Sequence, residues 1–315
     1  MASYHFTTIV SNTHVFKLLA LIHSLEQTAH SFKLSVLCAD LLAYKVLSQI
    51  PRPHVQYEQL HKIEDDALLK AKEDRTFHEY CWTLKPAFLL KILETSQADY
   101  LAHLDTDLYF YHNPEAIFAE NPLAHLFLTD HMNSERFYHF YELSGRFNTG
   151  FVGCRNTDIA KQAVTQWKDQ CIAHCTVEMD KEKKRYGDQR YVEGWVDNFE
   201  GVHVVQSKGA NAAIWNIENY QLSFVDGEVY LDENPLLFYH FSAFTIIDEK
   251  TFNLNWYYYM KDQKLVDYVY IPYANLVHTK IERVQQIFPD FQQGFIARKH
   301  VPDTHFYEVH KKPLI

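Results

Sequence analysis

Strand-like and helix-like segments alternate along the first third of the chain, and this order constrains the fold more than any single residue does. Residues 4–10, YHFTTIV, are rich in β-branched and aromatic side chains, which is typical of a strand. Apolar residues then recur at helical spacing from Val15 to Leu25. A second strand is expected at residues 32–40, a helix around residues 84–93 and a third strand at residues 100–104. This order predicts a doubly wound α/β sheet.

The rest of the chain adds to the sheet and then changes character. Further strands are expected at residues 125–130 and 147–154, followed by a helix whose apolar face runs from Ala160 to Cys175. From Trp256 onward the sequence is aromatic and amphipathic, which predicts helices. We therefore expect an α/β domain at residues 1–250 and a mainly helical extension at residues 251–315.

Two aspartates, Asp105 and Asp107, directly follow the apolar run at residues 100–104. Open α/β sheets bind ligands at the carboxyl ends of their strands, where these acids are expected to lie. In an extended segment, residues i and i+2 point to the same side, so the two carboxylates can share one hard cation such as Mg²⁺ or Mn²⁺. The alternative is a pair of solvated acids in a turn or at the start of a helix.

Two other protein classes use similar acids. Phosphatases of the haloacid dehalogenase type place an Asp-x-Asp near the N-terminus, usually before Thr or Val, whereas Leu108 and Tyr109 follow the acids here. Nucleotidyltransferases that make nucleotide sugars need a glycine-rich phosphate loop after the first strand. The sequence after Val10 is SNTHVFKLLA, which contains no glycine. Both classes are therefore disfavoured.

The net charge of −10 argues against nucleic acid as a partner, because nucleic-acid binding needs a basic face. No segment approaches the roughly 20 apolar residues of a membrane span, and the N-terminus lacks the features of a signal peptide. We therefore expect a cytoplasmic protein. The five cysteines, an odd number, are expected to be free thiols.

Six blocks, in chain order, resemble glycosyltransferases of the GT-A fold, and most of all bacterial enzymes related to glycosyltransferase family 8. The likeness covers roughly the first 245 residues and implies a Rossmann-like fold with a mixed central sheet. The blocks are WTLKPAFLLKIL, HLDTDLYFYHNPE, FNTGFVGCRN, YGDQRYV, GANAAIWNIENYQL and LLFYHFSAF.

The resemblance implies a metal-dependent transfer of a sugar from a nucleotide diphosphate to an acceptor hydroxyl. Asp105, Asp107 and His240 would hold Mn²⁺ or Mg²⁺ on the diphosphate. Lys85 would neutralise the phosphate charge, and Asp130 would bind hydroxyls of the donor sugar.

Further residues are carried over from the same blocks. Asp188 and Gln189 would lie beside the anomeric carbon. Asn148 and Asn211 offer amides that suit sugar hydroxyls, and Trp215 offers an aromatic plane.

The resembling enzymes mostly use UDP-sugars, which implies a UDP-sugar donor. The base is expected near Thr8, Ser11 and Asp40. The acceptor could be a glycan, a lipid-linked sugar or a protein, and the implied context is the assembly of bacterial surface polysaccharide or glycolipid. With a lipid-linked acceptor, the aromatic segment at residues 256–277 is compatible with peripheral contact at the inner face of a membrane. The alternative is a tail that packs on the catalytic domain.

Lys85, His240 and Asp188 also have local explanations. Thr83 is expected to cap a helix, with Lys85 in its first turn and Pro86 tolerated there. A cation at that helix end opposes the helix dipole, and a bound anion would relieve this conflict. His240 ends an apolar run and could be a core histidine. Asp188 could be a helix cap.

The stereochemistry also has two possible outcomes. Family 8 retains the anomeric configuration, which needs no protein nucleophile if the acceptor attacks on the leaving-group face. If the enzyme inverts, Asp188 or Asp130 would be the base. A second hypothesis is a catalytically silent nucleotide-sugar or carbohydrate binding protein on the same scaffold.

Overall fold

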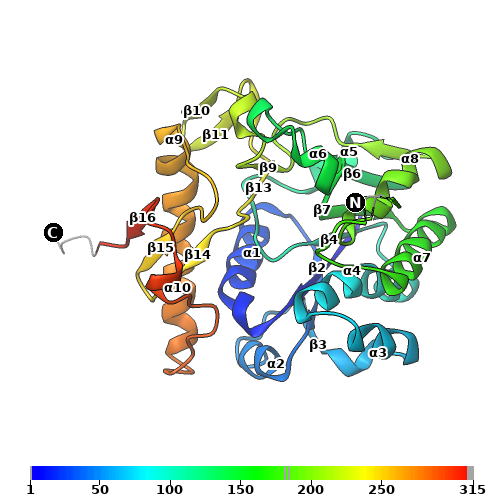
Figure 1. Cartoon of the computed structure of the whole chain (residues 1–315). Helices are drawn as coiled ribbons and strands as arrows, with labels where there is room; N and C mark the ends of the chain where they lie inside the picture. Colours follow the sequence, from blue (N-terminus) through cyan, green and yellow to red (C-terminus); the bar gives the residue numbers. More distant parts are fainter. Residues whose placement is uncertain (1, 181, 184, 311–315) are drawn as a thin grey trace.

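A seven-stranded mixed sheet forms the centre of the protein (Figure 1). The computed structural model describes residues 2–180, 182–183 and 185–310. Strand β4 is the middle strand, parallel to β1 and antiparallel to β7. The predicted strands are confirmed apart from their ends. In spatial order the strands are β3 (Val55–Gln59), β2 (Lys33–Cys38), β1 (Tyr4–Val10), β4 (Tyr100–Leu104), β7 (Phe147–Arg155), β6 (Leu126–Asp130) and β8 (Val202–Val204).

Helices cover both faces of this sheet, as the predicted α/β fold requires. One face packs against α1 (Val15–Thr28) and α2 (Leu41–Leu47). The other packs against α3 (Asp66–Glu73), α4 (Phe77–Thr95) and α7 (Asp158–Ala173). Each face therefore has its own apolar core. Three shorter helices are α5 (Glu115–Ala119), α6 (Phe140–Ser144) and α8 (Trp195–Asn198).

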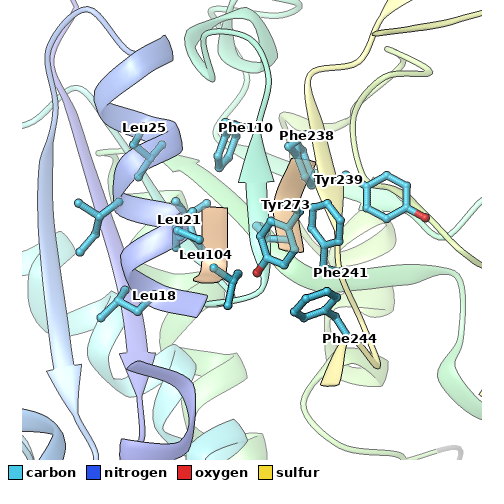
Figure 2. Packing of buried hydrophobic residues seen from close by; sticks show 14 of the residues in the cluster. Leu18, Leu21, Leu25, Leu104, Phe110, Phe238, Tyr239, Phe241, Phe244 and Tyr273 are labelled. Atoms are coloured by element: carbon cyan, nitrogen blue, oxygen red, sulfur yellow. The ribbon is translucent and has the colours of Figure 1, made fainter. Parts of the chain in front are cut away.

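A small second sheet lies beyond the carboxyl end of β4. It consists of β5 (Leu108–Phe110), β13 (Phe238–His240) and β9 (Ala212–Ala213), with β13 in the middle. Figure 2 shows leucines of α1 and aromatic side chains of β5 and β13 that belong to one apolar core. The register pairs His240 with Leu108, so a residue far along the chain is brought beside the loop that follows β4.

The tail differs from its predicted form. Residues 256–261 are not helical. The helix begins at α9 (Gln263–Leu265), continues through a π-helical turn (Val266–Tyr270) and ends with α10 (Ile271–Gln285). Helix α10 packs along α1 (Figure 1) and shares its apolar core, so the tail is part of the main body and not a separate appendage.

Two further antiparallel sheets complete the fold. The first follows β9 and the second joins the tail to the preceding chain, so the boundary expected at residue 250 falls inside a sheet. Their strands are β10 (Leu222–Val225), β11 (Glu228–Leu231) and β12 (Asn234–Pro235), then β14 (Thr245–Ile246), β15 (Thr251–Asn253) and β16 (Phe306–Glu308).

The packing of α10 predicts how the tail contributes to stability. Val277 of α10 is fully buried. We expect Val277→Asp to lower the free energy of unfolding by more than about 3 kcal/mol, because it places a charge in an apolar core. The control is Thr279, an exposed residue on the same helix. Thr279→Asp should change the free energy of unfolding by less than about 0.5 kcal/mol. Urea unfolding of both variants tests this; equal stabilities would show that α10 is dispensable.

All five cysteines are free, as the sequence predicts. Within the described residues, no helix has both the length and the apolar character needed to cross a bilayer. Peripheral membrane contact by the tail stays a prediction.

Candidate active site

The two aspartates lie in a tight turn between β4 and β5. The Leu108 N–H donates to the Asp105 carbonyl at 3.2 Å, which closes the turn. The expectation that Asp105 and Asp107 lie on one extended segment is therefore wrong in its local geometry. The turn nevertheless brings both carboxylates together at the carboxyl end of the central strand.

His240 completes a three-residue cluster with these acids. One ligand atom from each of Asp105, Asp107 and His240 lies within 4.8 Å of the other two. The Nδ1 ring nitrogen of His240 lies 3.2 Å from the Asn148 Oδ1. That oxygen also accepts the Gly150 N–H, so the Asn148 group facing Nδ1 is an acceptor and Nδ1 carries the proton.

The tautomer of His240 provides a test of whether the cluster fits a cation. With Nδ1 protonated, the Nε2 of a neutral ring presents its lone pair to the Asp107 Oδ1 at 3.2 Å. Two acceptors facing each other repel, and a cation between them replaces that repulsion with attraction. Two carboxylates and an imidazole suit Mn²⁺ or Mg²⁺, and Asn148 would fix the histidine ring from behind.

Gly150 lies in a bulge of β7 that allows this close approach. The pairing of β6 with β7 shifts register between Leu128 and Thr129, and the Gly150 carbonyl accepts the Asp105 N–H at 2.8 Å. A Cβ at residue 150 would lie 2.7 Å from both the Asn148 Oδ1 and the His240 Cε1. Only glycine therefore fits here without moving the histidine.

We expect Gly150→Ala to weaken Mn²⁺ binding by about 10- to 100-fold, because it displaces the histidine and its supporting amide. Titration calorimetry with Mn²⁺ measures this. Gly194→Ala is the control, since a Cβ there meets only the end of the Asn198 side chain, at 3.1 Å. Unchanged Mn²⁺ affinity in Gly150→Ala would show that His240 is not a metal ligand.

Lys85 forms a buried ion-pair network with two of the predicted site residues. Its Nζ lies 2.9 Å from the Asp105 Oδ1 and 3.5 Å from the Asp188 Oδ2. The Thr149 hydroxyl donates to the same Asp188 oxygen at 2.7 Å. Asp188 precedes a 3-10 helix (Gln189–Gly194), but within the described chain its side chain makes no capping bond to that helix. The Asp188 carboxylate therefore belongs to this network rather than to a cap.

The predicted position of Lys85 in the first turn of a helix is wrong. Helix α4 begins earlier, with Thr76 as its N-cap and a reciprocal bond between Thr76 and Glu79. Thr83 lies inside the helix and donates its hydroxyl to the Glu79 carbonyl. The conflict with the helix dipole therefore does not arise, and the neighbouring carboxylates hold Lys85 in place.

The charges of this network stabilise one another. Burial raises the pKa of Asp105, but the Lys85 ammonium outweighs burial and holds that pKa below its usual range. Burial lowers the pKa of Lys85, but Asp105 and Asp188 raise it above the ordinary lysine value. Both groups stay ionised at neutral pH.

Two cavities meet at this network. Cavity A has a volume of about 380 Å³ and cavity B one of about 520 Å³. The two share a wall made of His78, Trp82, Lys85, Asp105 and Asp107. Further residues that line cavity A include Asn133, Asn148, Asp188, Gln189, Trp215 and Tyr258. Those of cavity B include Ser11, Thr13, His14, Phe77 and Thr106.

Four of the predicted site residues are not in the described lining of either cavity. The Asp130 carboxylate accepts from the Arg146 Nε at 2.7 Å and faces a separate, smaller cavity. The Asn211 Nδ2 donates to the Asp130 carbonyl. Asp40 caps α2 and accepts the Asn12 N–H. Thr8 is fully buried in β1. Direct contact between these four and a donor stays a prediction.

Other residues reach the cavities without having been predicted. Tyr257 and Tyr258, from the non-helical start of the tail, form part of the wall of cavity A. His131 and Asn133 follow β6 and line the same cavity. For His131 and Asn133 the sequence signal was position alone, because HMN directly follows the strand that ends at Asp130.

A mixed sheet of this order, with two aspartates after its central strand and a distant histidine beside them, agrees with the GT-A fold. The chain belongs to the nucleotide-diphospho-sugar transferase family, whose profile matches residues 32–194. This result confirms the resemblance read from the six sequence blocks, at the level of family and fold.

The chain is also similar to individual proteins. The chain is 56% identical over 310 residues to YfnD of Bacillus subtilis (strain 168), covering 98% of this chain and 100% of YfnD. It is 28% identical to YfnF of the same organism, covering 93% and 97% of the two chains. Both relatives are described as uncharacterized proteins. A crystal structure of the galactosyltransferase LgtC with donor and acceptor sugar analogs matches with a TM-score of 0.54 at 12% identity, covering 87% of this chain and 95% of LgtC, which is a likeness of fold.

Proposed function

We propose that this protein transfers a sugar from a UDP-sugar to an acceptor hydroxyl, with retention of the anomeric configuration and with the help of Mn²⁺ or Mg²⁺. The observation that carries the proposal is that two cavities share a wall, and that this wall carries the Lys85 ammonium beside the carboxylates of Asp105 and Asp107. A nucleotide sugar has the same three parts: a nucleoside for cavity B, a diphosphate for the shared wall and a sugar for cavity A.

The chain's own residues organise the diphosphate end of the donor. Asp105, Asp107 and His240 would hold the cation, which when bound supplies Lewis-acid neutralisation of the diphosphate charge. Lys85 presents its ammonium at the same wall. Because Asp105 and Asp188 anchor that ammonium, it is already oriented before the donor binds, and it can stabilise charge that develops on the leaving diphosphate.

Retention is favoured because the carboxylates that could act as base are already paired. Asp188 accepts a hydrogen bond from the Thr149 hydroxyl at 2.7 Å and lies 3.5 Å from the Lys85 Nζ, so its carboxylate already has two partners. Asp130 is paired with Arg146 outside cavity A. A retaining transfer needs neither as base, since an oxygen of the departing diphosphate can accept the proton of the attacking hydroxyl. Gln189, in the lining of cavity A, is not a nucleophile but can donate its amide to the donor sugar.

The mouth of cavity A favours a glycan as the acceptor. Aromatic side chains from five regions of the chain line this cavity, and Tyr257 is 70% exposed. Flat aromatic faces stack on the apolar faces of sugar rings. Lys85, whose charge is already paired, is the one Lys or Arg in the described lining. An uncharged sugar chain suits this surface better than a phosphorylated acceptor, consistent with a role in surface polysaccharide or glycolipid assembly.

The alternative of a silent binding protein is disfavoured by the cluster itself. A protein that only binds sugar needs neither three converging metal ligands nor an ammonium oriented by two carboxylates. Turnover distinguishes the two functions directly.

We expect the protein to release UDP from at least one UDP-sugar in the presence of Mn²⁺ or Mg²⁺, slowly with water and faster with a glycan acceptor. Excess EDTA should lower the rate by at least about 100-fold, because the diphosphate loses its charge neutralisation. Chromatography of released UDP over a panel of UDP-sugars and acceptors measures this. Tight binding of UDP-sugars without turnover of any of them would favour the silent binding protein.

A further inference from the structure

Two buried hydrogen-bond donors in residues that line cavity A lack partners. The Asn133 Nδ2 and the Trp215 Nε1 are both buried, and neither has a hydrogen-bond partner among the described residues. Asn133 as a whole is only 6% exposed. A buried N–H without an acceptor loses its hydrogen bond to water and gains nothing in return. A ligand in cavity A that carries oxygen acceptors would give both groups a partner.

The two donors lie beside the metal ligands. The Trp215 ring packs edge-on against His240, with 5.2 Å between ring centroids, and against His131 at 5.7 Å. The Trp215 carbonyl accepts the N–H of Ser134, the residue after Asn133, at 2.8 Å. Asn133 and Trp215 thus belong to adjacent, hydrogen-bonded segments that end next to His240. This is the part of cavity A that the first sugar beyond the diphosphate would occupy.

The backbone segment that carries Asn133 is held in a fixed position. The Asn133 N–H donates to the Tyr141 hydroxyl at 3.0 Å, and the Asn216 Nδ2 donates to the His131 carbonyl at 2.9 Å. These bonds connect the segment after β6 to its surroundings on both sides. A preorganised donor loses little entropy when it binds an acceptor, and this is the usual arrangement of residues that determine specificity.

We propose that Asn133 and Trp215 donate hydrogen bonds to hydroxyl oxygens of the donor's sugar, and that the enzyme therefore selects a fully hydroxylated sugar over its monodeoxy analogues. The inference rests on the proposed function and deepens it, because it assigns the recognition of the sugar to two N–H groups and adds Asn133 to the site. A site built around such donors discriminates strongly, since an analogue that lacks the hydroxyl leaves the buried N–H unpaired.

Two variants test this without large changes of shape. Trp215→Phe keeps an aromatic ring against His240 and removes the N–H; Asn133→Ala removes the amide. The matched control is Trp195→Phe, because the Trp195 Nε1 is also buried and unpaired but Trp195 lies outside the described lining of cavity A. Thermal melts verify that each variant is folded.

Two measurements are made on each protein with Mn²⁺: the dissociation constants of UDP and of the UDP-sugar, and kcat/KM for the UDP-sugar and its monodeoxy analogues. We expect either variant to weaken UDP-sugar binding and to lower kcat/KM by about 10- to 100-fold, with UDP affinity unchanged within twofold and reduced discrimination against one deoxy analogue. Trp195→Phe should match the wild type.

The outcomes separate this inference from the proposed function. If the wild type binds UDP-sugars without turning them over, the proposed function fails, but the ratio of UDP to UDP-sugar affinity still tests the inference. Wild-type sugar affinity and discrimination in both variants would mean that water satisfies the two N–H groups, and would overturn it. An equal loss of UDP and UDP-sugar affinity would overturn it as well.

Discussion

Replacing Asp107 by Asn is expected to lower the turnover of the UDP-sugar by about 10²- to 10³-fold without unfolding the protein. The substitution keeps the size of the side chain but removes the charge that faces His240 at 3.2 Å. The cluster then has one carboxylate in place of two, and Mn²⁺ affinity should fall by at least about tenfold. The fold should survive, because the turn that carries Asp107 is closed by backbone bonds.

Glu142→Gln is the matched control for this substitution. Glu142 is an exposed acid on α6, a helix whose neighbouring residues line cavity A, so the charge change is the same but lies away from the cluster. We expect turnover within twofold of the wild type. Kinetics of UDP release, with Mn²⁺ titrated at each donor concentration, compare the two variants. Normal turnover in Asp107→Asn would exclude Asp107 from the site.

The second large effect is expected for Lys85→Met. This change removes a side chain that is 9% exposed and leaves the Asp188 carboxylate, itself 5% exposed, without its cation. Loss of one partner from a buried ion pair costs about 3–5 kcal/mol of stability. Turnover should fall by about 10²- to 10³-fold, because the ammonium no longer stabilises the leaving diphosphate. Excess Mn²⁺ should not restore it.

Lys91→Met separates this effect from the loss of any lysine on α4. Lys91 lies on the same helix and pairs with Glu58 at 3.0 Å, but its side chain is 34% exposed and away from the cavities. We expect a stability change below about 1 kcal/mol and unchanged turnover. Urea unfolding and donor hydrolysis are measured for both variants. Equal effects at the two positions would contradict the role given to Lys85.

The central sheet was predictable because its signals are local. Apolar periodicity identified β1, α1 and β4, and the rule that ligands bind at the carboxyl ends of strands placed Asp105 and Asp107 correctly. The start of α4 was missed although the sequence TFHE at residues 76–79 has the spacing of a capping box. The prediction placed the helix cap at Thr83, but both Thr83 and Pro86 lie inside α4.

The site needed information that no local pattern contains. His240 reaches the aspartates through the pairing of β13 with β5, a contact between distant segments, and resemblance alone indicated it beforehand. Asn133 carries no motif, and its importance rests on an unpaired amide that is visible only after folding. Tyr257 and Tyr258 were read as part of a helix, whereas the Asn255 side chain accepts both of their N–H groups and holds the segment in a turn.

The most direct test of the proposed metal site is a crystal structure with UDP and Mn²⁺, with anomalous diffraction data collected at the manganese edge. We expect one strong anomalous peak bounded by Asp105, Asp107 and His240, next to the diphosphate, with the uridine in cavity B and cavity A open for the sugar. A peak at another position, or UDP bound with no manganese at the three residues, would contradict it.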